Sequence, residues 1–233
     1  MPKPTLIALD TETGGLSEAL NPLLSIAVAV ADETYNLMDG FEIKIAPPKN
    51  AVIELPAPGS FGKHNFKKRL LGYMNVWTKE RMSSVPEGTP IVTGGAAEVN
   101  GYIGPDDLNW DMSAIDRWNA GASDVTQAQE DIITYLTSCF GESQVVTVAH
   151  NAVFDIKFVG MNMPKLLRKL KDPWFCTLNA SRELFKRRGV KQSAKLTEMA
   201  KLAGFDFEGK AHQAFADGEA TLAVLRYLKD NSV

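Results

Sequence analysis

Two acidic residues, Asp10 and Glu12, stand at the end of an apolar run where a buried strand would ordinarily carry no charge. Residues 6–9 (LIAL) are typical of a central strand, and the acids follow at a spacing of two. Alternate residues of a strand point to one face, so both carboxylates are expected to project together. Adjacent carboxylates repel each other unless a cation lies between them. The pair therefore predicts a site for a hard divalent metal ion.

Two more acids stand near the start of expected helices. Asp155 falls in the first turn of a helix that Asn151 is placed to cap, where the helix dipole favours a negative charge. Asp217 falls in the first turns of an amphipathic helix over 214–229, and His212 comes just before that helix. Each feature alone also fits an ordinary cap or a structural histidine, so the features are interpreted together.

Three motifs occur in a fixed order along the chain: DTETGGL from Asp10, HNAVFD ending at Asp155, and HQAFAD ending at Asp217. Their order and separation resemble the DnaQ-like 3′–5′ exonucleases of the ribonuclease H-like superfamily. The subgroup is the one named DEDDh for its Asp, Glu, Asp, Asp and His residues. A sister class carries tyrosine four residues before the last acid, where this chain has Gln213. The histidine class is therefore indicated.

The resemblance covers residues 5–47 and about 96–228. It departs from the family pattern at Gly14, where many members carry Thr or Ser. The loop around a bound 3′ terminus is therefore expected to rely more on backbone amides than on a hydroxyl at this position.

The resemblance also implies a catalytic arrangement with two Mg²⁺ ions about 3.5–4 Å apart, for which Mn²⁺ would substitute. Asp10 would bridge the ions, Glu12 and Asp217 would hold the ion that activates water, and Asp155 would support the second ion. His212 would act as the general base. All four acids are expected to converge in one pocket. The residues expected to bind the 3′-terminal nucleotide are Thr13, Gly14, Leu16 and Asn151.

The predicted fold class is α/β, with a ribonuclease H-like mixed five-stranded sheet flanked by helices. The first three strands are the one that carries Asp10 and Glu12 and those at residues 23–31 and 35–46. Because short connections join them, they should be antiparallel. Strands near 145–149 and 174–177 should then run parallel to the first. Helices are expected over 123–140, from 152 onward, and over 164–171, 178–188, 195–204 and 214–229.

A single exonuclease domain over 1–233 is expected, with a basic insertion at about 48–95 that prolines and glycines interrupt. A solvated surface helix around 66–77 explains its charges, and so does a flap that grips a nucleic-acid backbone. A second basic run allows the same two interpretations; it comprises Arg182, Lys186, Arg187, Arg188 and Lys191.

Composition excludes several classes of protein. The formal net charge of −3 gives no global basic footprint for nucleic acid, so any such surface has to be local. Cys139 and Cys176 lie far apart and predict neither a zinc site nor a disulfide scaffold. The N-terminus lacks the order of a signal peptide, and no apolar run is long enough to cross a membrane. A cytoplasmic protein is expected.

The leading functional hypothesis is a DNA 3′–5′ exonuclease of the proofreading or repair type, acting on single-stranded or frayed ends. Its partners would be a nucleic-acid 3′ end, DNA in preference to RNA, and a DNA polymerase. An RNA 3′ exonuclease, similar to oligoribonuclease or RNase T, is the second hypothesis, because contacts to a 2′-hydroxyl lie outside the motifs. The third is a non-catalytic, polymerase-associated module that binds nucleic acid. The sequence leaves the oligomeric state open.

Overall fold

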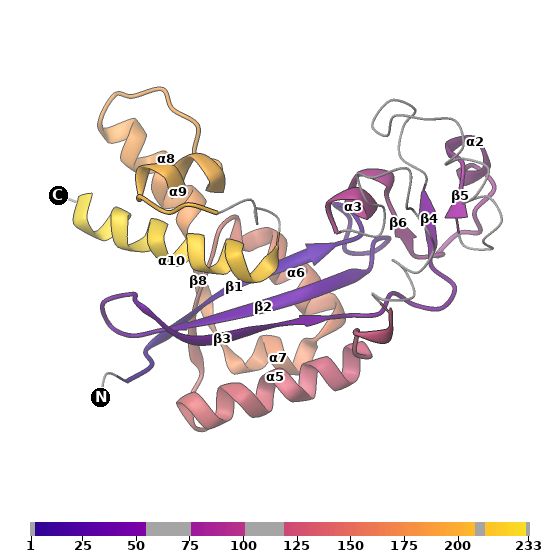
Figure 1. The fold of residues 1–233 in the computed structure, drawn as a ribbon, viewed down its shortest axis with the longest axis horizontal. Helices are drawn as coiled ribbons and strands as arrows, with labels where there is room; N and C mark the ends of the chain where they lie inside the picture. The colour runs from indigo at the N-terminus through magenta and orange to yellow at the C-terminus, as the bar shows by residue number, and fades with distance from the viewer. Residues whose placement is uncertain (1–2, 55–75, 101–118, 208–212, 232–233) are drawn as a thin grey trace. The chain divides into compact units, whose positions relative to one another are not determined.

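The computed structural model describes residues 3–54, 76–100, 119–207 and 213–231 (Figure 1). The chain divides into two compact units. One comprises Met1–Thr11, Ile26–Ile43 and Val125–Val233, and the other comprises Glu12–Ser25 and Lys44–Asp124. The organisation as one exonuclease domain with an insertion at about 48–95 stays a prediction.

The main sheet has five strands in the order β3-β2-β1-β7-β8. The first three strands are antiparallel, β7 runs parallel to β1, and β8 runs parallel to β7. This arrangement confirms the predicted fold class. The strands are β1 (Leu6–Thr13), β2 (Leu23–Ala31), β3 (Leu37–Lys44), β7 (Val145–Ala149) and β8 (Leu170–Cys176).

The interior strands follow directly from their apolar sequences. All nine residues of β2 are buried, as expected of a strand that lies between two others and under a helix. β3 is an edge strand, and its residues are exposed or half-buried. The strand order therefore places β1, with its two acids, at the centre of the sheet.

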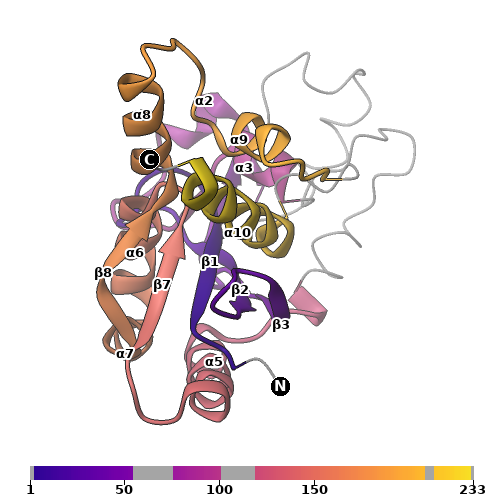
Figure 2. The same ribbon diagram turned by 90° about the vertical axis from the view of Figure 1, so that its left-hand side faces the viewer.

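Helices cover both faces of this sheet (Figures 1 and 2). On one face, α6 reaches β1 through a hydrogen bond between Asp155 and Thr11. On the other, Leu222 and Leu225 of α10 pack with Ala8 of β1, and α8 and α9 pack on α10. The bounds of the helices are α5 (Val125–Phe140), α6 (Ala152–Asn162), α7 (Pro164–Lys169), α8 (Thr177–Arg187), α9 (Leu196–Leu202) and α10 (Ala214–Asn231).

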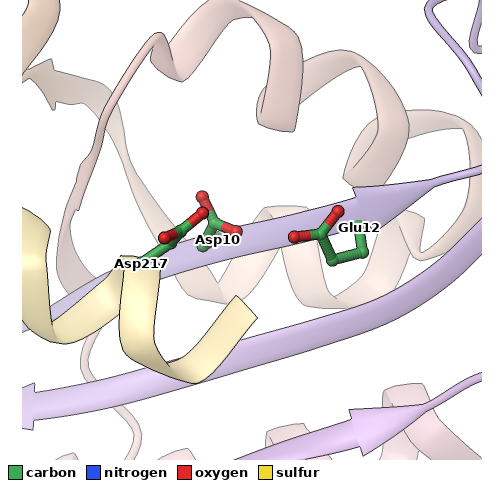
Figure 3. Close-up of side chains that lie close together, drawn as sticks. All are labelled: Asp10, Glu12 and Asp217. Carbon is green, nitrogen blue, oxygen red and sulfur yellow. The ribbon is translucent and has the colours of Figure 1, made fainter. Parts of the chain in front are cut away.

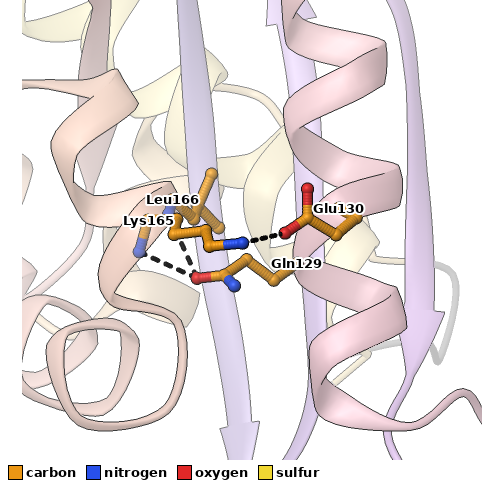
Figure 4. Close-up of polar contacts among 4 residues, drawn as sticks. All are labelled: Gln129, Glu130, Lys165 and Leu166. Atoms are coloured by element: carbon orange, nitrogen blue, oxygen red, sulfur yellow. Dashed lines mark hydrogen bonds and ion pairs between the residues drawn. The ribbon is translucent and has the colours of Figure 1, made fainter.

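The start of α7 is capped by a residue from another helix (Figure 4). The residue before α7, Met163, has no side chain that can accept a hydrogen bond from the first turn. The buried Gln129 of α5 takes that role, because its Oε1 accepts from the backbone N of Lys165 at 2.8 Å and of Leu166 at 3.3 Å. An exposed ion pair of 2.7 Å between Lys165 and Glu130 lies beside it. The hydrogen bonds of Gln129 and this ion pair hold α7 against α5.

The second unit contains a small parallel sheet in the order β5-β4-β6. Its strands are β4 (Val52–Glu54), β5 (Val76–Trp77) and β6 (Ile91–Val92). A short helix follows each of the last two strands, α2 (Lys79–Met82) after β5 and α3 (Gly94–Val99) after β6. The sequence did not predict these strands, because two or three residues are too few to show a periodicity. The helix expected around 66–77 is wrong at Val76 and Trp77, which pair with β4. Residues 66–75 lie outside the described part of the chain.

Within the described ranges, no helix combines the length and apolar character that crossing a bilayer requires.

Candidate active site

Three carboxylates meet at the end of β1 (Figure 3). Asp10 and Glu12 come from β1 and Asp217 from the first turn of α10, and each is half-buried. One oxygen from each side chain lies within 4.8 Å of the other two. The residues that the sequence pairs on one strand face are therefore joined by an acid more than two hundred positions away.

Small residues bring α10 close enough to β1 for this meeting. A Cβ atom on Gly218 would lie 3.5 Å from Cβ of Ala29 and 3.9 Å from the carbonyl oxygen of Ala8, so the helix rests almost on the strand backbone. The neighbouring Phe215 covers Gly40 of β3, where a Cβ would lie 2.5 Å from the ring. A side chain at Gly40 would require Phe215 or the backbone of β2 to shift, whereas the contacts at Gly218 are ordinary van der Waals distances.

The fourth acid, Asp155, is not a member of this three-carboxylate group. It is buried in the first turn of α6, and its Oδ1 accepts a hydrogen bond of 2.8 Å from the hydroxyl of Thr11. Burial raises the pKa of the Asp155 carboxyl to about 7, and the hydrogen bond from Thr11 opposes that rise. Asp155 thus contacts the residue between Asp10 and Glu12, and its role as a metal ligand stays a prediction.

The donor set fits a divalent cation. Three carboxylates this close repel one another, and a cation bound among them offsets the repulsion. All three donors are hard oxygens, which suit Mg²⁺ or Mn²⁺ better than they suit zinc or copper. The acidic cluster is therefore consistent with a metal-dependent nuclease.

His212, the predicted general base, lies outside the described residues. His150, at the end of β7, is half-buried, and its Nδ1 lies 2.9 Å from the hydroxyl of Thr177 at the start of α8. Burial lowers the pKa of His150 to about 4, and the charge of Arg182 adds to the lowering. A histidine that is neutral near pH 7 and hydrogen-bonds the start of α8 fits a structural role.

The predicted substrate residues differ in their surroundings. Leu16 is 87% exposed, whereas Thr13 and Gly14 are buried. The Thr13 hydroxyl donates to the carbonyl of Gly15, and the Gly14 amide donates to the carbonyl of Pro22. Both groups therefore already serve the loop that carries Leu16.

Asn151 occupies the N-cap position of α6 in the left-handed region, with φ of 71°. Its side chain makes no capping hydrogen bond, so the predicted side-chain cap is wrong. The exposed Asn151 side chain lies four positions before Asp155 and does not cap the helix.

The second basic run lies on α8 and the segment after it. Arg187 pairs with Glu183 at 3.6 Å, and Arg188 donates to Asn231 of α10. Both cations therefore have partners within the protein, which agrees with a solvated helix face for this part of the run.

Sequence reasoning missed two residues that support the site. Thr11 lies between the two acids and was not identified. Its signal is that a polar residue on a central strand, pointing away from the acids, needs a buried hydrogen-bond partner. Asn21 was also missed; it is buried and hydrogen-bonds both Ser17 and Ile91. A turn asparagine offers no sequence signal for a contact of that range.

Comparisons with known proteins agree with this geometry. The sequence profile of the exonuclease family RNase_T matches residues 98–225. The DNA polymerase III PolC-type protein of Clostridium perfringens (strain 13 / Type A) is 34% identical over 82 residues, which are 35% of this chain and 5% of that protein. This chain is thus similar to a small part of the polymerase.

Similar solved structures share the fold. The zinc-bound complex of E. coli exonuclease I with single-stranded DNA superposes with a TM-score of 0.61 at 16% identity, covering 99% of this chain and 41% of that one. The complex of the same enzyme with a dA16 oligonucleotide gives a TM-score of 0.61 at 16% identity, with 99% and 42% covered. The chain spans less than half the length of these exonuclease I chains.

The family profile includes the segments that carry Asp155 and Asp217, and the structure adds Asp10 and Glu12 beside Asp217. Because the match spans residues 98–225 of 233, this chain belongs to the RNase_T exonuclease family, the DnaQ-like group of 3′–5′ exonucleases.

Proposed function

We propose that this protein removes nucleoside monophosphates from the 3′ end of DNA, acting on single-stranded or frayed ends in proofreading or repair. The observation that carries the proposal is the meeting of Asp10, Glu12 and Asp217, whose carboxylate oxygens lie within 4.8 Å of one another. A phosphodiester can be hydrolysed where such a group holds hard divalent ions. Membership of the exonuclease family supports the 3′ to 5′ direction.

Asp10, Glu12 and Asp217 would hold Mg²⁺, or Mn²⁺ in its place, with Asp155 in support. The bound ions would make water a stronger nucleophile and stabilise the leaving 3′ oxygen. His212 would accept the proton that the attacking water loses, since an unperturbed histidine titrates near neutral pH. Thr11 would keep the Asp155 carboxyl oriented toward β1.

At the same 3′ end, Leu16 would pack against the terminal base, with Asn151 close to the nucleic-acid backbone. The choice of DNA is supported by the similar structures, since exonuclease I is bound there to single-stranded DNA and to a dA16 oligonucleotide. Similarity to a PolC-type DNA polymerase supports a polymerase as a partner.

The test is digestion of 20-residue oligonucleotides labelled at the 5′ end, in matched DNA, RNA and duplex-DNA forms, with Mg²⁺. We expect a ladder that shortens from the 3′ end, fastest on single-stranded DNA and abolished by EDTA. Asp10→Asn should lower the rate at least about 100-fold, because it removes one charge from the cation site. Asp230→Asn, an exposed acid near the end of α10, is the matched control and should behave as wild type.

Two outcomes would contradict the proposal. Faster digestion of RNA than of DNA would show that RNA, not DNA, is the preferred substrate. Strong binding of all three oligonucleotides without any hydrolysis in either metal would favour a non-catalytic binding module.

A further inference from the structure

The loop that follows Glu12 is tied to a segment seventy residues further along the chain. The backbone N of Ile91 donates to the carbonyl of Leu20 at 2.8 Å, and the N of Thr93 donates to the carbonyl of Gly14 at 2.7 Å. A side-chain bond of 2.7 Å, from Nδ2 of Asn21 to the carbonyl of Ile91, lies between them. Strand β6 and the residue after it thus hold both ends of the loop.

Asn21 is the side chain that joins these pieces. It is only 8% exposed and uses both ends of its amide, because Oδ1 accepts from the backbone N of Ser17 at 2.9 Å while Nδ2 donates to Ile91. Its own backbone N also donates to the carbonyl of Ser17 at 2.8 Å. Removing a partner from a buried hydrogen-bonded group is costly, so this residue constrains the loop strongly.

Close packing in the loop explains its two glycines. A Cβ on Gly14 would lie 2.7 Å from Cδ of Pro22 and 3.0 Å from the carbonyl oxygen of Ile91. A Cβ on Gly15 would lie 2.6 Å from Oδ1 of Asn21. The Thr or Ser that many members of the family carry at the position of Gly14 would therefore clash here with Pro22 and with the carbonyl of Ile91.

The side chain of Leu16 projects from this hydrogen-bonded loop into solvent. Its neighbour Ser17 is anchored by Asn21, and the Gly14 amide and carbonyl are both used within the framework. The leucine side chain is 87% exposed, although hydrogen bonds hold the backbone on both sides of it. Because the backbone that carries it is already held, Leu16 can contact a ligand with a smaller loss of backbone conformational entropy.

We infer that Asn21 is a positioning residue for substrate binding: it fixes residues 14–20 against Ile91 so that Leu16 is presented to the 3′-terminal nucleotide. This inference rests on the proposed exonuclease function. It makes the end of the insertion, β6, a part of the substrate site rather than a surface addition. Because Asn21 touches no carboxylate of the acidic group in the described residues, it acts on binding and not on the chemical step.

The experiment compares Asn21→Leu, which keeps the branching and the number of side-chain heavy atoms and removes both side-chain bonds, with Asn36→Leu, an exposed turn asparagine as control. With single-stranded DNA and Mg²⁺ we expect Asn21→Leu to raise KM about 10-fold and to change kcat less than threefold. Asn36→Leu should leave both unchanged. In a Leu16→Ala background the effect of Asn21→Leu on KM should disappear, because both residues act in one unit.

A second variant guards against misfolding. Asn21→Asp keeps the oxygen that accepts from Ser17 but cannot donate to Ile91, so its KM should lie between those of wild type and Asn21→Leu. Amide exchange at Ser17 should be faster in Asn21→Leu than in wild type, with or without substrate. If wild type is active and Asn21→Leu has the same KM as wild type, the inference is wrong and the proposed function is unaffected. A wild type without hydrolysis would instead overturn the proposed function, and unchanged exchange at Ser17 would remove the anchor itself.

Discussion

At the scale of single residues, Thr11 connects the acids of β1 to the acid of α6. Alternation along the strand directs it away from Asp10 and Glu12, into the side of the sheet where Asp155 is buried. Its hydroxyl favours the charged form of a carboxyl whose burial favours the protonated form. The charge available near the cation site therefore depends on a neutral side chain.

Thr11→Val tests this dependence, since valine keeps the shape and removes the donor. We expect the free energy of unfolding of the metal-free protein to fall by about 1–3 kcal/mol. The affinity for Mn²⁺ should fall about 10-fold, as for other residues that orient a ligand through a hydrogen bond. Denaturant unfolding and Mn²⁺ titration measure the two effects. Thr134→Val, an exposed threonine of α5, is the control, and equal results for both variants would remove Thr11 from the account.

His150 gives a second residue-scale prediction, concerning pH. The pKa of its ring is lowered from an ordinary 6.5 to about 4 by burial and by Arg182. The unfolded chain therefore binds a proton on His150 at higher pH than the folded protein does. The contribution of neutral His150 to the free energy of unfolding is complete above pH 6.5 and is lost as the pH falls toward 4. Asp155, whose pKa is raised, has the opposite sign, with stability falling as the pH rises between its unfolded value and about 7.

The measurement is the free energy of unfolding of the metal-free protein at several pH values between 7 and 4.5. Comparing wild type with His150→Asn cancels the contribution of Asp155, which both proteins share. We expect the loss of stability below pH 6.5 to be smaller in His150→Asn. Identical pH profiles would show that His150 does not titrate in this way.

At the scale of elements, most helices and strands of the main sheet could be predicted from sequence because each is long enough to show its periodicity. β2 (Leu23–Ala31) and β7 (Val145–Ala149) were predicted with their observed bounds, since both are continuous apolar runs between polar turns. β8 begins at Leu170, earlier than predicted, because exposed residues of an edge strand carry no apolar pattern. The short strands β4, β5 and β6 show no pattern at all and exist through their pairing.

The cap that α5 provides for α7 yields a prediction at this scale. Gln129→Leu keeps helix propensity and removes the acceptor of two backbone N–H groups at the start of α7. We expect the free energy of unfolding to fall by about 1–2 kcal/mol, the usual cost of losing an N-cap. Gln127→Leu, on the exposed side of the same helix, should change stability by less than about 0.5 kcal/mol. If both variants unfold at the same denaturant concentration, the cap contributes nothing to stability.

At the scale of the whole molecule, the sequence motifs predicted which acids matter but not how they meet. Asp10 and Glu12 share a strand face, so their proximity follows from the backbone alone. Asp217 joins them because α10 packs closely on the sheet beside Gly218 and Gly40, an arrangement that depends on residues from separate elements. Asp155 was expected beside them; its carboxylate accepts a hydrogen bond from Thr11, and its role as a metal ligand stays a prediction.

The claim on which the account depends is that Asp10, Glu12 and Asp217 together bind a divalent cation. Electron paramagnetic resonance measures this directly, because the signal of aqueous Mn²⁺ decreases as the ion is bound. Titrating Mn²⁺ into wild type, Asp217→Asn and Asp230→Asn compares two acids of one helix. We predict binding by wild type and Asp230→Asn, and affinity at least 10-fold weaker in Asp217→Asn, since one anionic ligand is lost. Equal binding by all three proteins would contradict the account.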